Sequence, residues 1–153
     1  MRTETRATTE QATAVRRATL DQGQPAGWFP RAFGEVADYL HRHGIAPYGY
    51  PFARCHRVAD GRFEVEAGFP VAVPIDGNGT IEPSSLPRGQ VLAVWHVGAH
   101  ETVGTAYRAV DEWLRNESAA STGDPWEVYH DLPTGDPLRR RTEILQPITF
   151  AGA

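Results

Sequence analysis

A carboxylate and a phenol stand two positions apart near the C-terminal end of the chain, in the segment 126–131 (WEVYHD). This segment is predicted to be a strand, and alternate side chains of a strand point to the same face. Glu127 and Tyr129 therefore share one face, and Val128 lies on the other. A carboxylate in such a place can act as the counter-charge for a cation or as a general base, and a phenol can orient it or a bound molecule.

The face that carries Glu127 follows from the cost of burying charge. An unpaired carboxylate that points into an apolar, helix-covered core costs several kcal/mol. We therefore expect Glu127 and Tyr129 on the open face of their sheet, with Val128 in the core. Burial is expected to raise the pKa of Glu127, which suits a general base. On the residues alone, a surface glutamate on an edge strand remains the alternative.

Aromatic side chains elsewhere can form the walls of a site for a flat ligand. Trp95 lies in the apolar segment 90–97 (QVLAVWHV), and either face of that strand can be the core, so Trp95 faces either the core or the site. A tryptophan beside a desolvated cation is worth up to about 2 kcal/mol. Tyr48 and Tyr50 flank Gly49 in a loop, where they are expected to form a lid over a ligand or a turn packed on proline.

Other catalytic constellations are not indicated. His96 and His100 are four residues apart, but they straddle Gly98 at a strand-to-helix junction and not on one helix face, which does not suit a metal site. Cys55 has no evident base partner, and neither a GxSxG motif nor a glycine-rich phosphate loop occurs. We predict no metal and no cofactor.

Composition and charge narrow the class of protein. A chain of 153 residues fits one domain with a sizeable core. The net charge is −4 and the fifteen basic residues, all Arg, form no long basic run, which argues against direct binding of nucleic acid. A membrane span and a secretory signal are not indicated. With its single Cys55 the chain is expected to be cytoplasmic, and a homodimer is left open.

Hydrophobic periodicity predicts the same order of elements twice. A strand, an amphipathic helix and two further strands follow one another in each half. In the first half these are residues 12–20, 28–43, 52–58 and 62–67, and in the second half they are 90–97, 101–116, 126–131 and 142–148.

Two such βαββ units predict an α+β fold. Their strands are expected to form an antiparallel sheet with both helices on one face, which leaves the other face to curve around a ligand cleft. We predict a flexible N-terminus at 1–11 and a single domain over 12–150. Within it, 12–73 is the first unit, 74–88 a linker rich in Pro, Gly and Ser, and 89–150 the second unit.

Five segments of the chain form a recognisable set: PYGYPFARCHR, RFEVEAGFPVAVP, LPRGQVLAVWHVGAHETVGTAYRAVDEWL, GDPWEVYHDLP and LRRRTEILQPI. Together they resemble a known family, the GyrI-like small-molecule-binding domain, which is also the effector-binding domain of AraC- and MerR-type regulators. The resemblance implies a pseudo-twofold pair of βαββ units with a cleft for hydrophobic, often cationic, aromatic compounds. Glu127 matches the family's buried Glu, whereas His100 stands where the family usually has a Tyr.

The resemblance and the residues lead to three functional hypotheses. The first is a stand-alone protein, without a DNA-binding module, that senses or sequesters small aromatic compounds, cations in particular. The second is a hydrolase that opens electrophilic cyclopropane-type rings, with Glu127 as general base and Tyr129 beside it. The third is a protein-interaction role such as inhibition of DNA gyrase. The predicted ligand-binding residues are Glu127, Tyr129, Trp95, Tyr48, Tyr50 and His100.

Overall fold

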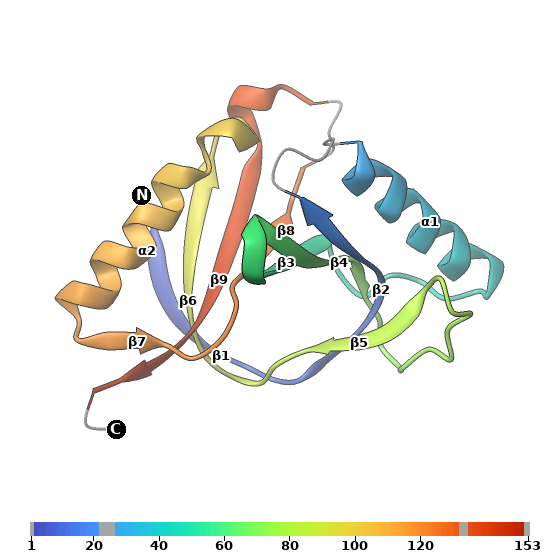
Figure 1. Ribbon diagram of the computed structural model, residues 1–153, viewed down its shortest axis with the longest axis horizontal. Coiled ribbons are helices and arrows are strands. Elements are labelled where there is room, and N and C mark those ends of the chain that lie inside the picture. The colour runs from blue at the N-terminus through green and yellow to red at the C-terminus, as the bar shows by residue number, and fades with distance from the viewer. Residues whose placement is uncertain (1, 22–26, 132–134, 152–153) are drawn as a thin grey trace. The chain divides into compact units, whose positions relative to one another are not determined.

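A computed structural model describes residues 2–21, 27–131 and 135–151, and the chain separates into two compact units. The first unit is Glu10–Pro87, and the second combines Met1–Thr9 with Arg88–Ala153. Each unit contains strands and one α-helix in the predicted order of strand, helix, strand, strand (Figure 1). The strand pairings within each unit are antiparallel, so the predicted α+β class is confirmed.

In the first unit, the strands pair in the order β3-β4-β2-β5. A short 3-10 turn at Ala59–Gly61 joins β3 to β4. Its Asp60 and Gly61 both have positive φ angles, which the Asp-Gly pair adopts readily in tight turns. The elements are β2 (Gln11–Asp21), α1 (Trp28–Arg42), β3 (Phe52–Arg57), β4 (Arg62–Pro70) and β5 (Glu82–Leu86).

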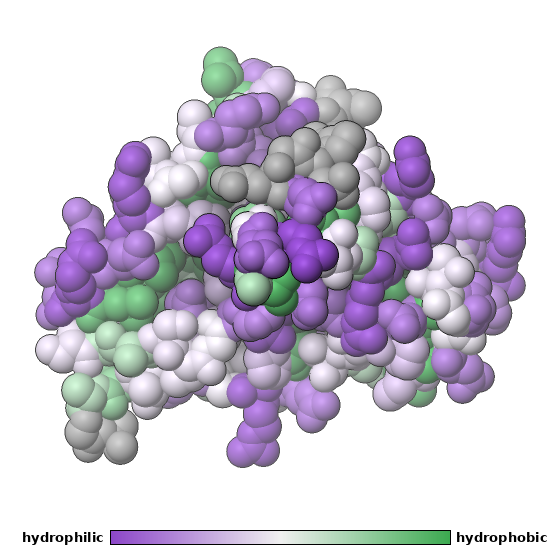
Figure 2. Space-filling view, in the orientation of Figure 1, coloured by the Kyte–Doolittle hydropathy of each residue, from purple (hydrophilic) through white to green (hydrophobic). Residues whose placement is uncertain are grey.

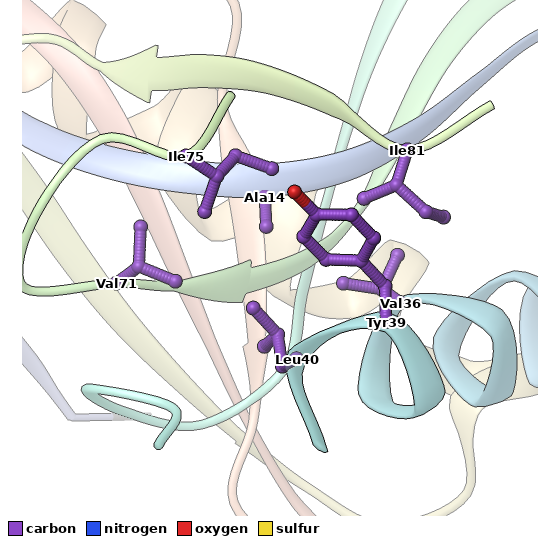
Figure 3. Packing of buried hydrophobic residues seen from close by; sticks show 7 residues of the cluster. All are labelled: Ala14, Val36, Tyr39, Leu40, Val71, Ile75 and Ile81. Carbon is purple, nitrogen blue, oxygen red and sulfur yellow. The ribbon is translucent and has the colours of Figure 1, made fainter. Parts of the chain in front are cut away.

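The core of the first unit lies between α1 and the sheet. Val36, Tyr39 and Leu40 recur at the spacing of one helix face, and all three are buried. Figure 3 shows them pointing toward Ala14 of β2 and toward three aliphatic residues that follow β4. Burying an aliphatic side chain of this size contributes about 1.5–3 kcal/mol, so this cluster holds α1 on the sheet. The three aliphatic residues are Val71, Ile75 and Ile81.

The second unit holds the segment that carries Glu127. Its strands pair in the order β1-β6-β9-β8, and β7 also pairs with β9. A 3-10 turn at His100–Thr102 leads from β6 into α2, and a second such turn, Pro137–Arg139, precedes β9. The elements are β1 (Thr3–Thr8), β6 (Gly89–Val97), α2 (Gly104–Asn116), β7 (Ala119–Ser121), β8 (Trp126–Tyr129) and β9 (Arg141–Phe150).

The helix α2 covers one face of the second unit's sheet and lies along β6 and β9 (Figure 1). Ala106 and Val110 of α2 pack on Leu92 and Val94 of β6 and on two isoleucines of β9, all of them buried. The sequence left open which face of strand 90–97 is the core. The face of Leu92 and Val94 is the one beneath α2. The two isoleucines are Ile144 and Ile148.

The N-terminal segment differs from the prediction of a flexible end at 1–11. Residues Thr3–Thr8 form β1, which pairs with β6 from Thr3 opposite Val94 to Thr8 opposite Gly89. Threonine is β-branched and favours strands, but β1 has no apolar alternation, and its partner lies far along the chain. The pairing therefore left no local signal in the sequence.

Two further segments were predicted as loops but contain strands. Within the predicted linker 74–88, residues Glu82–Leu86 form β5 and pair with β2. This strand carries Pro83, which a strand at the end of the pairing order tolerates because its N–H side need not join a ladder. The segment between the predicted helix 101–116 and the predicted strand 126–131 contains the short β7, which pairs with the end of β9.

Figure 2 shows hydrophilic residues over most of the face in view, with apolar residues in separate patches among them. Of the helices within the described residues, none is long and apolar enough to cross a membrane.

Candidate functional site

Glu127 lies in β8 directly opposite Ile144 of β9, which lies in turn opposite Val94 of β6. Ile144 and Val94 are buried beneath α2, and directly opposed residues of neighbouring strands point to the same side of a sheet. Glu127 therefore lies on the α2 side. This contradicts our prediction that Glu127 and Tyr129 face away from the helix-covered side with Val128 in the core.

Three polar side chains surround the Glu127 carboxylate. Tyr107 donates a hydrogen bond to Oε2 at 2.5 Å, and Tyr129 donates one to Oε1 at 2.9 Å. His100 Nε2 lies 3.1 Å from Oε1. The Glu127 side chain is only 15% exposed, so these contacts replace the water that burial removes. We placed Glu127 on the open face because burying an unpaired carboxylate is costly in free energy. Here its three partners offset that cost.

Each partner comes from a different element. Tyr129 follows Glu127 by two positions in β8 and shares its face, as the strand alternation predicted. Tyr107 stands near the start of α2, and His100 begins the 3-10 turn that precedes it. The chain enters this turn through Gly98, whose φ of 139° favours glycine. The rings of His100 and Tyr129 meet edge to face, with their centroids 6.3 Å apart.

Tyr107 is the residue of this group that the sequence analysis missed. It stands in the amphipathic helix predicted at 101–116, and it packs against the cluster beneath α2. A half-buried tyrosine usually finds a partner for its hydroxyl, and this is the signal that the sequence offered. The partner itself becomes visible only once β8 is placed beside the start of α2.

Burial on its own raises the pKa of Glu127, but the hydrogen bonds from His100, Tyr107 and Tyr129 and the charge of His100 outweigh it and lower the pKa below its ordinary value of 4.5. This corrects our expectation of a raised pKa. Glu127 is therefore ionised at neutral pH and suits a cationic ligand. It is also a weaker proton acceptor than an ordinary carboxylate.

The hydrogen bond to Glu127 raises the pKa of His100 above its ordinary value of 6.5; partial burial opposes this, while the charges of Glu127 and Glu101 add to it. Because the pKa of Glu127 is lowered, its contribution to stability is present above pH 4.5 and is lost as the pH falls through the folded value. Because the pKa of His100 is raised, its contribution is present below pH 6.5 and is lost as the pH rises through the folded value. The pair stabilises the fold most between these limits.

The Tyr107→Phe substitution tests this arrangement. It removes the donor to Oε2 and leaves a buried charge less well satisfied, so we expect the free energy of unfolding at neutral pH to fall by about 1.5–3 kcal/mol. The pKa of Glu127 is expected to rise. Urea denaturation measures the first effect and carboxyl NMR titration the second. Tyr48→Phe is the matched control, because Tyr48 is 67% exposed, and an unchanged Glu127 pKa in Tyr107→Phe would contradict the assignment.

Trp95 does not join this group. In β6 it lies opposite Glu143 of β9, on the side of the sheet away from α2, so it faces the opposite way from Glu127. The guanidinium of Arg2 lies 5.3 Å from its ring centroid, and the ring of His130 lies 4.6 Å away. Trp95 therefore faces the open side of the sheet and not the core, and it does not lie beside Glu127; its role as a wall for a flat ligand stays a prediction.

Tyr48 and Tyr50 belong to the first unit. They are 67% and 53% exposed, as the prediction of a surface loop requires. Tyr48 lines a surface pocket of about 480 Å³ together with Glu10 and other residues of the same unit. The predicted lid over a ligand stays a prediction for both tyrosines.

The histidines that we considered as metal ligands have separate partners. His96 is buried, and its Nε2 lies 3.1 Å from both the Ala99 carbonyl and the Thr102 hydroxyl, whereas His100 contacts Glu127. Over residues 2–21, 27–131 and 135–151, no three His, Cys, Asp or Glu side chains gather in a way that could hold a metal ion.

Comparison with known proteins identifies the family. The model of the GyrI-like small molecule binding domain matches residues 14–149. The chain belongs to the GyrI-like family. This confirms the resemblance drawn from the sequence and makes the chain a small-molecule-binding domain. Among curated proteins, none matches this GyrI-like chain significantly.

Solved structures with the same fold share less than 20% sequence identity with this chain in the examples that follow. The C-terminal domain of EcmrR is 19% identical with a TM-score of 0.84, over 98% of both chains. In the complex of EcmrR with DNA, the match covers 98% of this protein but only 58% of the EcmrR chain. A hydrolase from Listeria innocua is 10% identical with a TM-score of 0.68, over 96% of this chain and 91% of that one. SAV2435 bound to tetraphenylphosphonium is 13% identical with a TM-score of 0.63, over 97% and 94%. At these identities the likeness shows the fold alone.

Proposed function

We propose that this GyrI-like protein binds small aromatic cations and that the Glu127 carboxylate is their counter-charge. The observation that carries the proposal is that the Glu127 side chain is only 15% exposed and accepts hydrogen bonds from Tyr107 and Tyr129, which favour its ionised form. A carboxylate that has lost most of its water interacts with a cation more strongly than one in bulk solvent, because the local dielectric constant is lower. A neutral molecule of the same shape lacks this interaction, so the site favours positive charge.

The side chains around Glu127 suit an aromatic ligand. Tyr107 and Tyr129 hold the carboxylate through their hydroxyls, so an aromatic ring lies next to each of its oxygens. Aromatic rings attract cations through their negative faces, which adds about 0.5–2 kcal/mol to binding. SAV2435, which shares the fold, is bound to tetraphenylphosphonium, a cation surrounded by aromatic rings. The same class of ligand is the natural first probe for this chain.

The hydrolase hypothesis is not part of this proposal. A general base works best when its pKa lies near the working pH, and the pKa of Glu127 is lowered instead of raised. Both carboxylate oxygens also accept hydrogen bonds already, which leaves little room to bind a water molecule for attack. Gyrase inhibition stays a prediction from the family resemblance.

The test is isothermal titration of the purified chain with tetraphenylphosphonium and with triphenylphosphine oxide, a neutral compound of related shape. We expect the cation to bind in the micromolar range at neutral pH and the neutral compound to bind at least about tenfold more weakly, a difference of about 1.4 kcal/mol. Equal affinity for the two compounds would remove Glu127 from the proposal, and failure of both to bind would remove the aromatic ligand class.

A further inference from the structure

His100 differs from the other two partners of Glu127 in both exposure and chemistry. Its side chain is 59% exposed, against 15% for Glu127 itself. The imidazole can therefore exchange its proton with solvent and can move away from the carboxylate at little cost in buried surface. A tyrosine phenol ordinarily changes charge far above neutral pH, whereas a histidine changes charge close to it. Of the three partners, His100 is the one that can bring a positive charge to Glu127.

The charged and titratable groups around His100 come from each element beside it. Glu101 follows it in the same turn, Glu127 and Tyr129 face it from β8, and Tyr107 lies on α2. Both carboxylates favour the protonated imidazole, and the pKa of His100 is raised accordingly. A proton on His100 and a cationic ligand therefore satisfy the same carboxylate.

We propose that His100 sets the charge selectivity of the Glu127 site, with its proton acting as an internal cation that a positively charged ligand replaces. This inference rests on the function proposed above. With His100 protonated, the imidazolium partly neutralises the carboxylate, and the preference of the site for cations over uncharged aromatic molecules is weaker. With His100 neutral, Glu127 keeps its full charge for the ligand. Binding of a cation then releases a proton, and by linkage a rise in pH tightens binding.

The test combines pH with one substitution. Tetraphenylphosphonium is titrated into the wild-type chain at about pH 5.5 and about pH 8, on either side of the range in which histidine titrates. We expect about tenfold tighter binding at the higher pH, and proton release near the titration midpoint, seen as a dependence of the heat on the buffer. His100→Gln keeps an N–H donor but has no charge, so its affinity is expected to change little with pH. His41→Gln, which removes an exposed histidine on α1, is expected to behave like the wild type.

A second measurement needs no ligand. NMR titration of the His100 ring is expected to show a lower midpoint in Glu127→Gln than in the wild type, because the carboxylate that holds the proton is gone. An unchanged midpoint overturns the inference. Binding of the cation that does not depend on pH in the wild type would also overturn it, and so would a pH dependence that persists in His100→Gln. In each of these three cases the proposed function still stands. If the cation binds at neither pH, both the proposed function and this inference fall.

Discussion

The Glu127→Gln variant is expected to bind tetraphenylphosphonium about 10- to 100-fold more weakly than the wild type, which corresponds to about 1.4–2.7 kcal/mol. Two opposite charges about 5 Å apart attract by about 3 kcal/mol at an effective dielectric constant near 20. Part of this attraction is offset because the ligand competes with His100 for the same oxygen. The amide has nearly the shape of the carboxylate, so the loss measures charge and not space. Isothermal titration at neutral pH gives the ratio.

The controls for this variant separate charge from folding. Glu112→Gln removes one negative charge from an exposed position on α2 and is expected to bind the cation as the wild type does. Triphenylphosphine oxide should bind Glu127→Gln about as well as it binds the wild type, because it has no charge to lose. Equal weakening of both ligands would mean that the variant has lost the shape of the site, and circular dichroism would then show whether it is folded.

The Gly68→Ala substitution is expected to cost about 3 kcal/mol or more of stability, a large part of what a domain of this size has. Gly68 stands inside β4, opposite Val15 of β2 and Phe52 of β3. A Cβ atom there would overlap the Ala14 carbonyl oxygen and would lie 2.9 Å from the Val15 Cα. Both obstacles are backbone, which cannot rotate away. Chemical denaturation measures the loss.

Gly34→Ala is the matched control for this prediction. Gly34 lies in α1, and a Cβ atom there would have no neighbour within 4 Å. Alanine restricts the unfolded chain and favours helix, so the free energy of unfolding of this variant is expected to rise by about 0.4–1 kcal/mol. If Gly68→Ala were as stable as the wild type, β2 and β4 would have to lie further apart than the structure has them.

The candidate site shows what a sequence can and cannot predict. Strand alternation correctly paired Glu127 with Tyr129, because the period of a strand depends on the backbone alone. It could not say which face they occupy, since that depends on the opposition of Glu127 to Ile144 in a neighbouring strand. The cost of burying an unpaired carboxylate favours the open face, but Glu127 is not unpaired. Tyr107 supplies the missing partner from an element whose position is set by packing.

In the fold, too, elements with a local sequence signal were predicted and elements that depend on distant partners were not. The helix at 28–42 and the strand at 89–97 were predicted within about a residue, because each carries its own periodicity. The strands β1 and β5 were missed because their sequences are polar or contain Pro83, and because their partners β6 and β2 lie far away in the chain. The resemblance to the GyrI-like family added what no single segment indicates, namely that the Glu127 segment belongs to a ligand-binding domain.

The most direct measurement of the central claim is a crystal structure of the protein with tetraphenylphosphonium bound. We expect the phosphorus to lie within about 6 Å of the Glu127 carboxylate, with phenyl rings against Tyr107 or Tyr129 and with the His100 imidazole moved from its place 3.1 Å from Oε1. A ligand bound elsewhere, with the contacts of Glu127 to Tyr107, Tyr129 and His100 all intact, would contradict it.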